Sequence, residues 1–296
     1  MFALALLTAV AAVPDRDPAL VAPPIRAMLD AAMAAEDEGA VATIVKYART
    51  ADPAGGDTVA QIADEWRAAR ARAREQRLAE AGTFDLWTGR VEAGGFMSTG
   101  NSDVTGATAT VDLTREGLNW RHKLRLQADY QRSGGVTSRE HYLAAYEPNL
   151  KLDGRRYIYG SAQFESDRFF GYRQRYAASV GYGYSVLQRP DLRLDLEAGP
   201  AFRETAFTDD TSQSSLAARG KLDFLWKLSS GVTLTQDGSA YVERYNSTVS
   251  GTTALAAKLI GPLSARVSYT VQYESMPPAG RVTTDTTSRA SLVYSF

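Results

Sequence analysis

The sequence predicts an all-β protein: a transmembrane antiparallel β-barrel of about 12 strands, preceded by a short α-helical segment. Three observations indicate this fold. Hydrophobicity alternates with a period of two over long stretches from residue 84 onward. The turns between these stretches alternate between short and long. The last stretch ends on an aromatic residue, Phe296, at the terminal carboxylate.

The composition excludes several classes of protein. The 296 residues include 33 Lys and Arg against 34 Asp and Glu, so no basic surface for a nucleic-acid partner is expected. The chain has no cysteine, which excludes disulfides and thiol catalysis. No run approaches the roughly 18 apolar residues that a membrane-spanning helix needs. A barrel strand escapes that test, because only every second residue faces lipid.

The first segment resembles a secretory signal. Residues 1–12 are apolar and end with small residues at Ala9, Ala11 and Ala12, as a signal peptide does before its cleavage site. No Lys or Arg precedes the apolar run, so a buried N-terminal helix is the alternative. We therefore expect three parts: a signal peptide at 1–12, a helical periplasmic segment at 13–83 and an outer-membrane barrel at 84–296.

The helical segment should contain three helices. Pro23-Pro24 would start the first, and a second is expected over 38–49. Gly55-Gly56 should break the chain, with Asp57 as the N-cap of a third helix over 58–80. The third helix carries a cluster of arginines that could contact anionic lipid heads or peptidoglycan, or could form a solvated face paired with nearby acids. A periplasmic partner of these helices is possible. The arginines are Arg67, Arg70, Arg72, Arg74 and Arg77.

The barrel strands are long and amphipathic. Over 263–274, for example, Leu263, Ala265, Val267, Tyr269 and Val271 alternate with polar residues. Such runs exceed the ~5–6 residues usual for soluble sheets and match the ~9–11 that a tilted spanning strand needs. A soluble β-sandwich would not require them. The expected strands are 88–98, 104–115, 120–132, 140–151, 156–167, 172–187, 191–205, 214–228, 231–245, 248–260, 263–275 and 283–296.

The connections and the C-terminus favour the bacterial outer membrane. Short turns should lie at the end of the barrel that holds both termini, and longer polar loops at the other end. An even strand count places both termini in the periplasm. The outward residues of the last strand, Leu292, Tyr294 and Phe296, are an expected signal for the barrel-assembly machinery. Outer-membrane lipid and lipopolysaccharide are the expected surroundings.

The start of the barrel region carries a family resemblance. The stretch Val91-Glu-Ala-Gly-Gly-Phe-Met-Ser-Thr-Gly-Asn-Ser-Asp103, with its turn Gly100, Asn101, Ser102 and Asp103, and the terminal Tyr-Ser-Phe resemble the salt-induced outer-membrane protein family, a domain family of unknown function. The resemblance covers about 88–296. It implies an outer-membrane location and a link to salt or osmotic stress, and it brings no catalytic or ligand residue.

Enzyme chemistry is not indicated by the sequence. An outer-membrane lipid hydrolase would need a serine activated by histidine, and the chain has only His122 and His141. Neither has a serine two residues away. No phosphate-binding glycine loop or zinc constellation is present. We therefore expect no enzyme activity, no cofactor and no metal. A lipid hydrolase, and an envelope binding module acting through the N-terminal helices, are the alternatives.

The remaining candidate site is the set of charges that alternation points into the lumen. Opposite charges could pair into a plug, giving a structural barrel, or could line a narrow channel for small solutes. Twelve strands enclose more space than a filled barrel of eight and less than a porin of 16–18. Pairing depends on strand register, so both functions stay open here. The candidates are Arg121, Lys123, Arg125, Asp129, Arg193, Asp195, Glu197, Arg219, Lys221, Asp223, Arg266 and Glu274.

Overall fold

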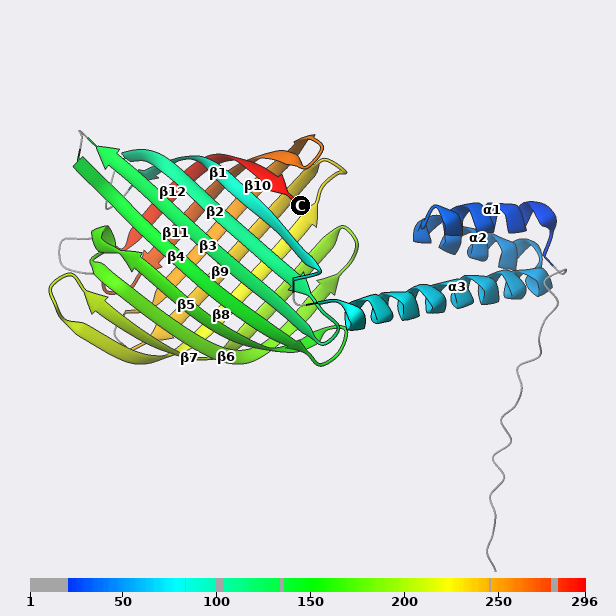
Figure 1. Cartoon of the computed structure of the whole chain (residues 1–296), viewed down its shortest axis with the longest axis horizontal. Coiled ribbons are helices and arrows are strands. Elements are labelled where there is room, and N and C mark those ends of the chain that lie inside the picture. The colour runs from blue at the N-terminus through cyan, green and yellow to red at the C-terminus, as the bar shows by residue number, and fades with distance from the viewer. Residues whose placement is uncertain (1–20, 83, 100–103, 134–135, 245, 278–281) are drawn as a thin grey trace, which may run out of the picture. The chain divides into compact units, whose positions relative to one another are not determined.

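The computed structural model describes residues 21–82, 84–99, 104–133, 136–244, 246–277 and 282–296. The chain forms two compact units that divide between Glu80 and Ala81. The first unit is helical and the second is a sheet closed into a barrel (Figure 1). The expected signal peptide at 1–12 and the expected turn at Gly100–Asp103 lie outside the described residues.

The helical unit contains α1 (Pro23–Ala34), α2 (Glu38–Ala51) and α3 (Pro53–Glu80). Proline stands at the start of α1, and the Asp37 side chain caps α2 by accepting a hydrogen bond from the Ala40 backbone N–H at 2.9 Å. Within the described residues, no helix is both long and apolar enough to cross a membrane. The three helices share a small apolar core of Val21, Leu29, Ala32, Val41, Ala48, Val59 and Ala63.

The start of α3 corrects the expectation from the sequence. The helix begins at Pro53, so Gly55 and Gly56 lie in its first turns and Asp57 is not its N-cap. A Cβ atom on Gly56 would collide with the Arg49 backbone of α2. The glycine is therefore needed for the close approach of two helices, which local sequence signals do not reveal.

The second unit contains twelve described strands, and each pairs antiparallel with its neighbours. The first and last strands pair from Arg90↔Ser295 to Thr99↔Thr286, which closes the sheet. The strands run obliquely around the barrel (Figure 1). They are β1 (Trp87–Thr99), β2 (Val104–Glu116), β3 (Trp120–Ser133), β4 (Val136–Lys151), β5 (Arg156–Asp167), β6 (Tyr172–Gln188), β7 (Leu192–Phe207), β8 (Ser212–Lys227), β9 (Val232–Glu243), β10 (Thr248–Ile260), β11 (Leu263–Glu274) and β12 (Thr284–Ser295).

The predicted fold class is thus confirmed, and most strand ends lie within two residues of those expected. The largest difference is the start of β4, which begins at Val136 because Ser133 and Val136 still pair across the hairpin. The end of the barrel where β1 begins and β12 ends is called the turn end below, and the opposite end the loop end. At the loop end, a short 3-10 helix, η2 (Arg168–Phe170), follows β5.

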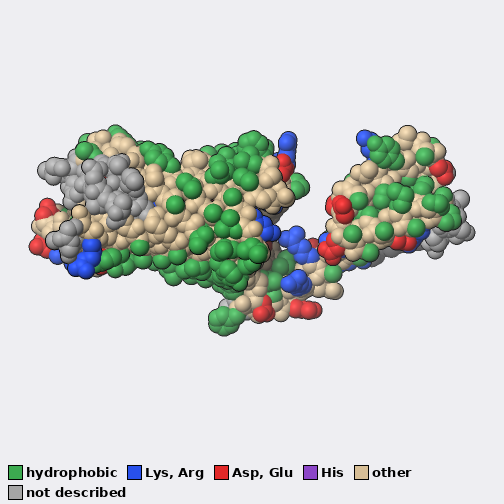
Figure 2. Space-filling model, turned by 90° about the horizontal axis from the view of Figure 1, so that it is seen from above, with side chains coloured by type: hydrophobic (Ala, Val, Ile, Leu, Met, Phe, Trp, Pro, Cys, Tyr) green, Lys and Arg blue, Asp and Glu red, His purple; other side chains and the backbone are tan. Residues whose placement is uncertain are grey.

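The outer surface of the barrel is apolar. On β11, Val267, Tyr269 and Tyr273 are exposed by 63%, 49% and 42%, whereas the intervening Ser268 is buried. A similar alternation is clear on β6 and β7, and Figure 2 shows hydrophobic side chains spread over the visible wall of the barrel. Monomeric soluble proteins rarely expose apolar surface over such an area. This wall has the character of a surface that contacts lipid.

The outward face of β11 supplies a stability test. We expect Val267→Arg to lower the free energy of unfolding by about 2–4 kcal/mol, because a mid-strand cation would be forced into hydrocarbon. Val267→Leu, which keeps the site apolar, should cost much less. Urea unfolding of the protein folded into phospholipid vesicles measures both. Equal stability of the two variants would mean that Val267 does not face lipid.

Candidate functional site

The inward side chains surround a cavity of about 750 Å³ inside the barrel. Its lining reaches from the turn end, at Thr88 and Ser295, to the loop end, at Asp167 and Asp285. Seven of the twelve candidate charges line it: Lys123, Arg125, Asp129, Arg193, Arg219, Lys221 and Asp223. The lining is therefore highly charged, with both signs represented.

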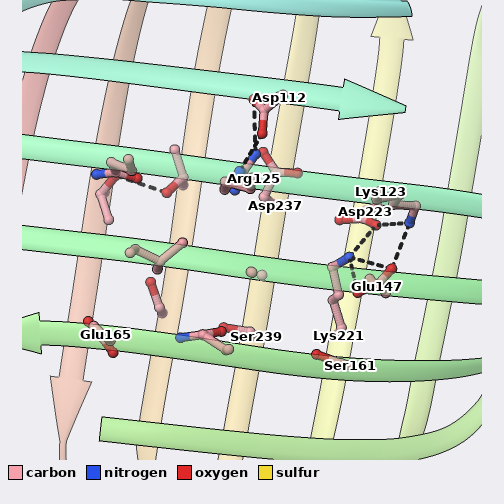
Figure 3. A pocket seen from close by; sticks show the side chains of 18 of the residues that line it. Asp112, Lys123, Arg125, Glu147, Ser161, Glu165, Lys221, Asp223, Asp237 and Ser239 are labelled. Carbon is pink, nitrogen blue, oxygen red and sulfur yellow. Dashed lines mark hydrogen bonds and ion pairs between the residues drawn. The ribbon is translucent and has the colours of Figure 1, made fainter. Parts of the chain in front are cut away.

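One cluster of charges crosses the lumen. Glu147 on β4 accepts hydrogen bonds from Lys123 on β3 at 2.9 Å, Lys221 on β8 at 3.1 Å and Arg219 on β8 at 3.2 Å. Lys123 also lies 3.6 Å from Asp223 on β8. In the closed order of strands, β3 and β8 are five positions apart, almost opposite each other. Figure 3 shows Lys123, Glu147, Lys221 and Asp223 meeting in the cavity. We call this group the central bridge.

A second crossing lies toward the loop end. Arg175 on β6 approaches Glu274 on β11 to 3.6 Å, and these strands are also five positions apart. Both side chains are almost fully buried. Charges removed from water in this way need compensating partners, because an isolated buried ion costs several kcal/mol. The two crossings therefore hold opposite walls together.

A histidine network lies beside the second crossing. His141 on β4 has its Nδ1 3.0 Å from an Asp129 oxygen and its Nε2 3.1 Å from a Glu165 oxygen. Arg289 on β12 donates to the same Asp129 carboxylate at 2.8 Å, and Tyr172 donates to Glu165 at 2.8 Å. Both ring nitrogens of His141 are thus occupied by carboxylates.

The remaining candidate charges pair along the wall. Arg125 donates to Asp112 at 2.6 Å, and Arg266 donates to Glu92 at 2.9 Å. With the pairs along the wall, the two crossings and the histidine network, every one of the twelve candidate residues takes part in an ion pair. The remaining pairs are Arg121 with Glu116, Arg193 with Asp195, and Glu197 with Arg219.

Several of the partners were not predicted from the sequence. Glu92 and Asp112 were not among the candidate residues, although each alternates with apolar neighbours: Glu92 with Val91 and Ala93 on β1, and Asp112 with Val111 and Leu113 on β2. The period-two rule applied to these two strands would have found them. The hydrogen bonds that they accept from residues of other strands carry no such local signal.

One sector of the lumen is filled by aromatic rings. Tyr157 and Tyr159 of β5 are buried, and Tyr157 donates to Glu197 at 3.1 Å. Their rings lie over Gly183 and Gly181 of β6, where any added Cβ would collide with them. The guanidinium of Arg219 stands 4.9 Å from the Tyr159 ring centre. These rings consequently occupy the lumen beside Gly181 and Gly183.

The contacts of the two histidines differ from those of a hydrolase site, in which a histidine would activate a serine. His122 faces outward at the turn end, stacked between Trp120 and Tyr146, with its Nδ1 2.8 Å from the Tyr146 hydroxyl. His141 contacts carboxylates through both nitrogens. Among the described residues, no group of three metal-ligating side chains is found. In the part of the chain that the structure describes, the hydrogen-bond partners of the two histidines are Tyr146, Asp129 and Glu165, and none of these is a serine.

The expected assembly residues lie at the closing edge of the sheet. Leu292, Tyr294 and Phe296 are exposed on the outer face of β12, between 50% and 57%. Phe296 exchanges two backbone hydrogen bonds of 2.9 Å with Gly89 near the start of β1. The terminal residue is therefore part of the seam that closes the barrel.

The central bridge predicts a large stability effect. Replacing Glu147 by Gln would leave Lys123, Lys221 and Arg219 with less compensating charge, and we expect a loss of about 3–5 kcal/mol in the free energy of unfolding. Glu204→Gln is the matched control, because Glu204 is exposed on the outer face of β7. Urea unfolding in vesicles compares them. Equal midpoints would show that the bridge contributes nothing to stability.

Comparison with known proteins places the barrel in a sequence family. The uncharacterized protein YdiY of Escherichia coli K12 is 28% identical over 208 residues, covering 70% of this chain and 82% of that protein. Among solved structures, the NanC porin has a TM-score of 0.49 at 12% identity, covering 69% of this chain and 98% of the porin. The KdgM porin in complex with disordered oligogalacturonate has a TM-score of 0.42 at 14% identity, covering 70% and 99%.

The family model for DUF481, a protein family of unknown function, matches residues 91–296. This range begins in β1 and includes every later strand to the C-terminus. It excludes α1, α2 and α3. The match covers more than half of the chain, and the chain therefore belongs to the DUF481 family.

Proposed function

We propose that the protein is a non-enzymatic barrel of the bacterial outer membrane that forms a narrow channel for small solutes. The observation that carries this proposal is the cavity of about 750 Å³, whose lining includes residues of both barrel ends. The apolar outer wall supports the membrane location, because such a surface is stable in hydrocarbon. Filled lumens, as in barrels of about eight strands, leave no comparable space.

The two crossings support a narrow channel rather than a wide one. The central bridge and the Arg175–Glu274 pair each join nearly opposite walls. Solutes must pass beside these groups, since breaking a buried ion pair costs several kcal/mol. A structural barrel without transport is the related alternative, and it would show no conductance.

The channel proposal predicts a conductance change in a charge-neutral variant. Refolded protein in a planar bilayer should give small discrete steps. Replacing both Lys123 and Asp223 by Ala removes one link across the lumen without changing net charge, and larger steps are expected. The control replaces Arg26 and Asp30, an exposed pair on α1 2.9 Å apart, and should leave the steps unchanged. Folded but electrically silent protein would favour the structural barrel.

The absence of enzyme activity belongs to the same proposal. His141 is held by two carboxylates and His122 lies among outward aromatic rings, which supports a structural role for both. A change in lipid composition that depends on His122 would instead support a lipid hydrolase.

A link to salt or osmotic stress would appear as a growth defect of a deletion strain at raised salt.

We also propose that the barrel-assembly machinery recognises the end of β12. The outward row of Leu292, Tyr294 and Phe296 supports this, together with the position of Phe296 at the closing seam. In cells, Phe296→Ser should lower the amount of folded barrel in the outer membrane, whereas Ser295→Ala should not. Heat-modifiable migration on gels measures the folded fraction. Equal amounts of folded barrel for the two variants would show that Phe296 is not part of the assembly signal.

A second candidate function is capture of a periplasmic partner by the helical unit. It is favoured by the C-terminal half of α3, where the side chains from 69 to 80 are exposed except for the half-buried Leu78. Arg72, Arg74 and Arg77 lie in this stretch. Deleting residues 21–80 should then abolish co-purification of the partner while leaving conductance intact. Unchanged co-purification would count against this function.

A further inference from the structure

The inward side chains of β9 to β12 form two adjacent rows of uncharged polar groups. Strand register places Ser239, Ser250 and Gln272 opposite one another in one row. Thr252, Thr270 and Thr287 form the next row. All six line the cavity. We call this surface, made of Ser239, Ser250, Thr252, Thr270, Gln272 and Thr287, the hydroxyl wall.

The cavity is open along this wall. Ser239, Ser250, Thr252, Thr270 and Gln272 are each half-buried, so part of every side chain faces free space. In the sector of β5, by contrast, Tyr157 and Tyr159 are buried. The aromatic sector is thus packed, while the sector of β9 to β11 retains room for solvent.

Most of the wall has unused hydrogen-bonding capacity. Thr252 and Thr270 bond to each other at 2.8 Å. The side chains of Ser239, Ser250 and Gln272 make no hydrogen bond to any described residue of the chain. Hydroxyls can donate and accept, and an amide carries both a carbonyl oxygen and an NH₂ group. The wall can therefore replace the water around a solute that itself carries several hydroxyls.

The charges around the wall do not favour ions. Groups of both signs flank the rows, because Lys221 of β8 stands opposite Ser239 and Asp237 of β9 stands opposite Thr252. The lysines, the arginine and the acids of the central bridge, which come from β3, β4 and the neighbouring strand β8, are already paired with one another. An ion that passes the central bridge loses part of its hydration while the charges there are engaged with one another, and that loss is costly.

We propose that the hydroxyl wall is the solute path of this channel and that it binds small neutral polyhydroxy solutes, of sugar or polyol type, in preference to ions of the same size. The inference rests on the proposed channel function and names the substrate class of that channel. Two rows of hydrogen-bonding groups, with free space beside them, are the features of the wall that would recognise such a solute.

Swelling of liposomes that contain the refolded full-length protein tests the preference. Glucose, glucosamine hydrochloride and sodium gluconate have nearly the same size and differ in charge. The proposal expects glucose to enter faster than either ion. Glucose entry no faster than entry of either ion overturns the proposal while leaving the channel in place. Entry of none of the three overturns the channel function itself, and the proposal with it.

Variants of the wall provide the matched comparison. The double variant Thr252→Val, Thr270→Val keeps the side-chain shape and removes two hydroxyls, and glucose entry should fall about threefold or more. Ser250→Ala is a milder second variant. Ser161→Ala removes a hydroxyl from the lumen side of β5, away from the wall, and should leave glucose entry unchanged. Heat-modifiable migration verifies folding. Wall variants that behave like Ser161→Ala would overturn the proposal.

Discussion

Closure of the sheet is the constraint on which the rest of the structure depends. In hydrocarbon, an unpaired backbone N–H or C=O costs several kcal/mol, so a membrane-spanning sheet must have no free edge. The pairing of β1 with β12, completed by the two hydrogen bonds between Gly89 and Phe296, removes that edge. Closure also separates two environments, lipid outside and a lumen inside, and the period-two alternation of each strand then assigns every side chain to one of them.

Closure of the sheet also creates an interior that must be filled or stabilised. Twelve strands enclose more space than apolar side chains on one face could fill, and the inward positions are polar. Buried charges inside such a lumen are stable when opposite signs meet with good geometry. The central bridge and the Arg175–Glu274 pair meet this condition by reaching across the lumen rather than along the wall. They therefore brace the barrel and narrow it at the same time.

The two sides of the lumen differ in chemical character, and this difference bears on the function of the barrel. Tyrosines lying over glycines fill the sector of β5 and β6, while β9 to β12 contribute hydroxyl and amide groups beside open space. The charged residues that dominate the sequence of the lumen thus act mainly on one another. The uncharged residues beside the cavity are the groups with hydrogen-bonding capacity left for a solute. A search for function by charge alone would overlook them.

The sequence by itself determined the barrel class, the approximate ends of the strands and the face on which each side chain lies. These properties are local, since alternation and turn chemistry are read from neighbouring residues. The inward direction of Lys123, Lys221 and Asp223 followed in this way. The tertiary structure alone decided that Lys123 meets Asp223, because residues from nearly opposite strands are brought together by register and closure. The close packing of Gly56 on α2 was decided in the same way, by a contact with no local signal.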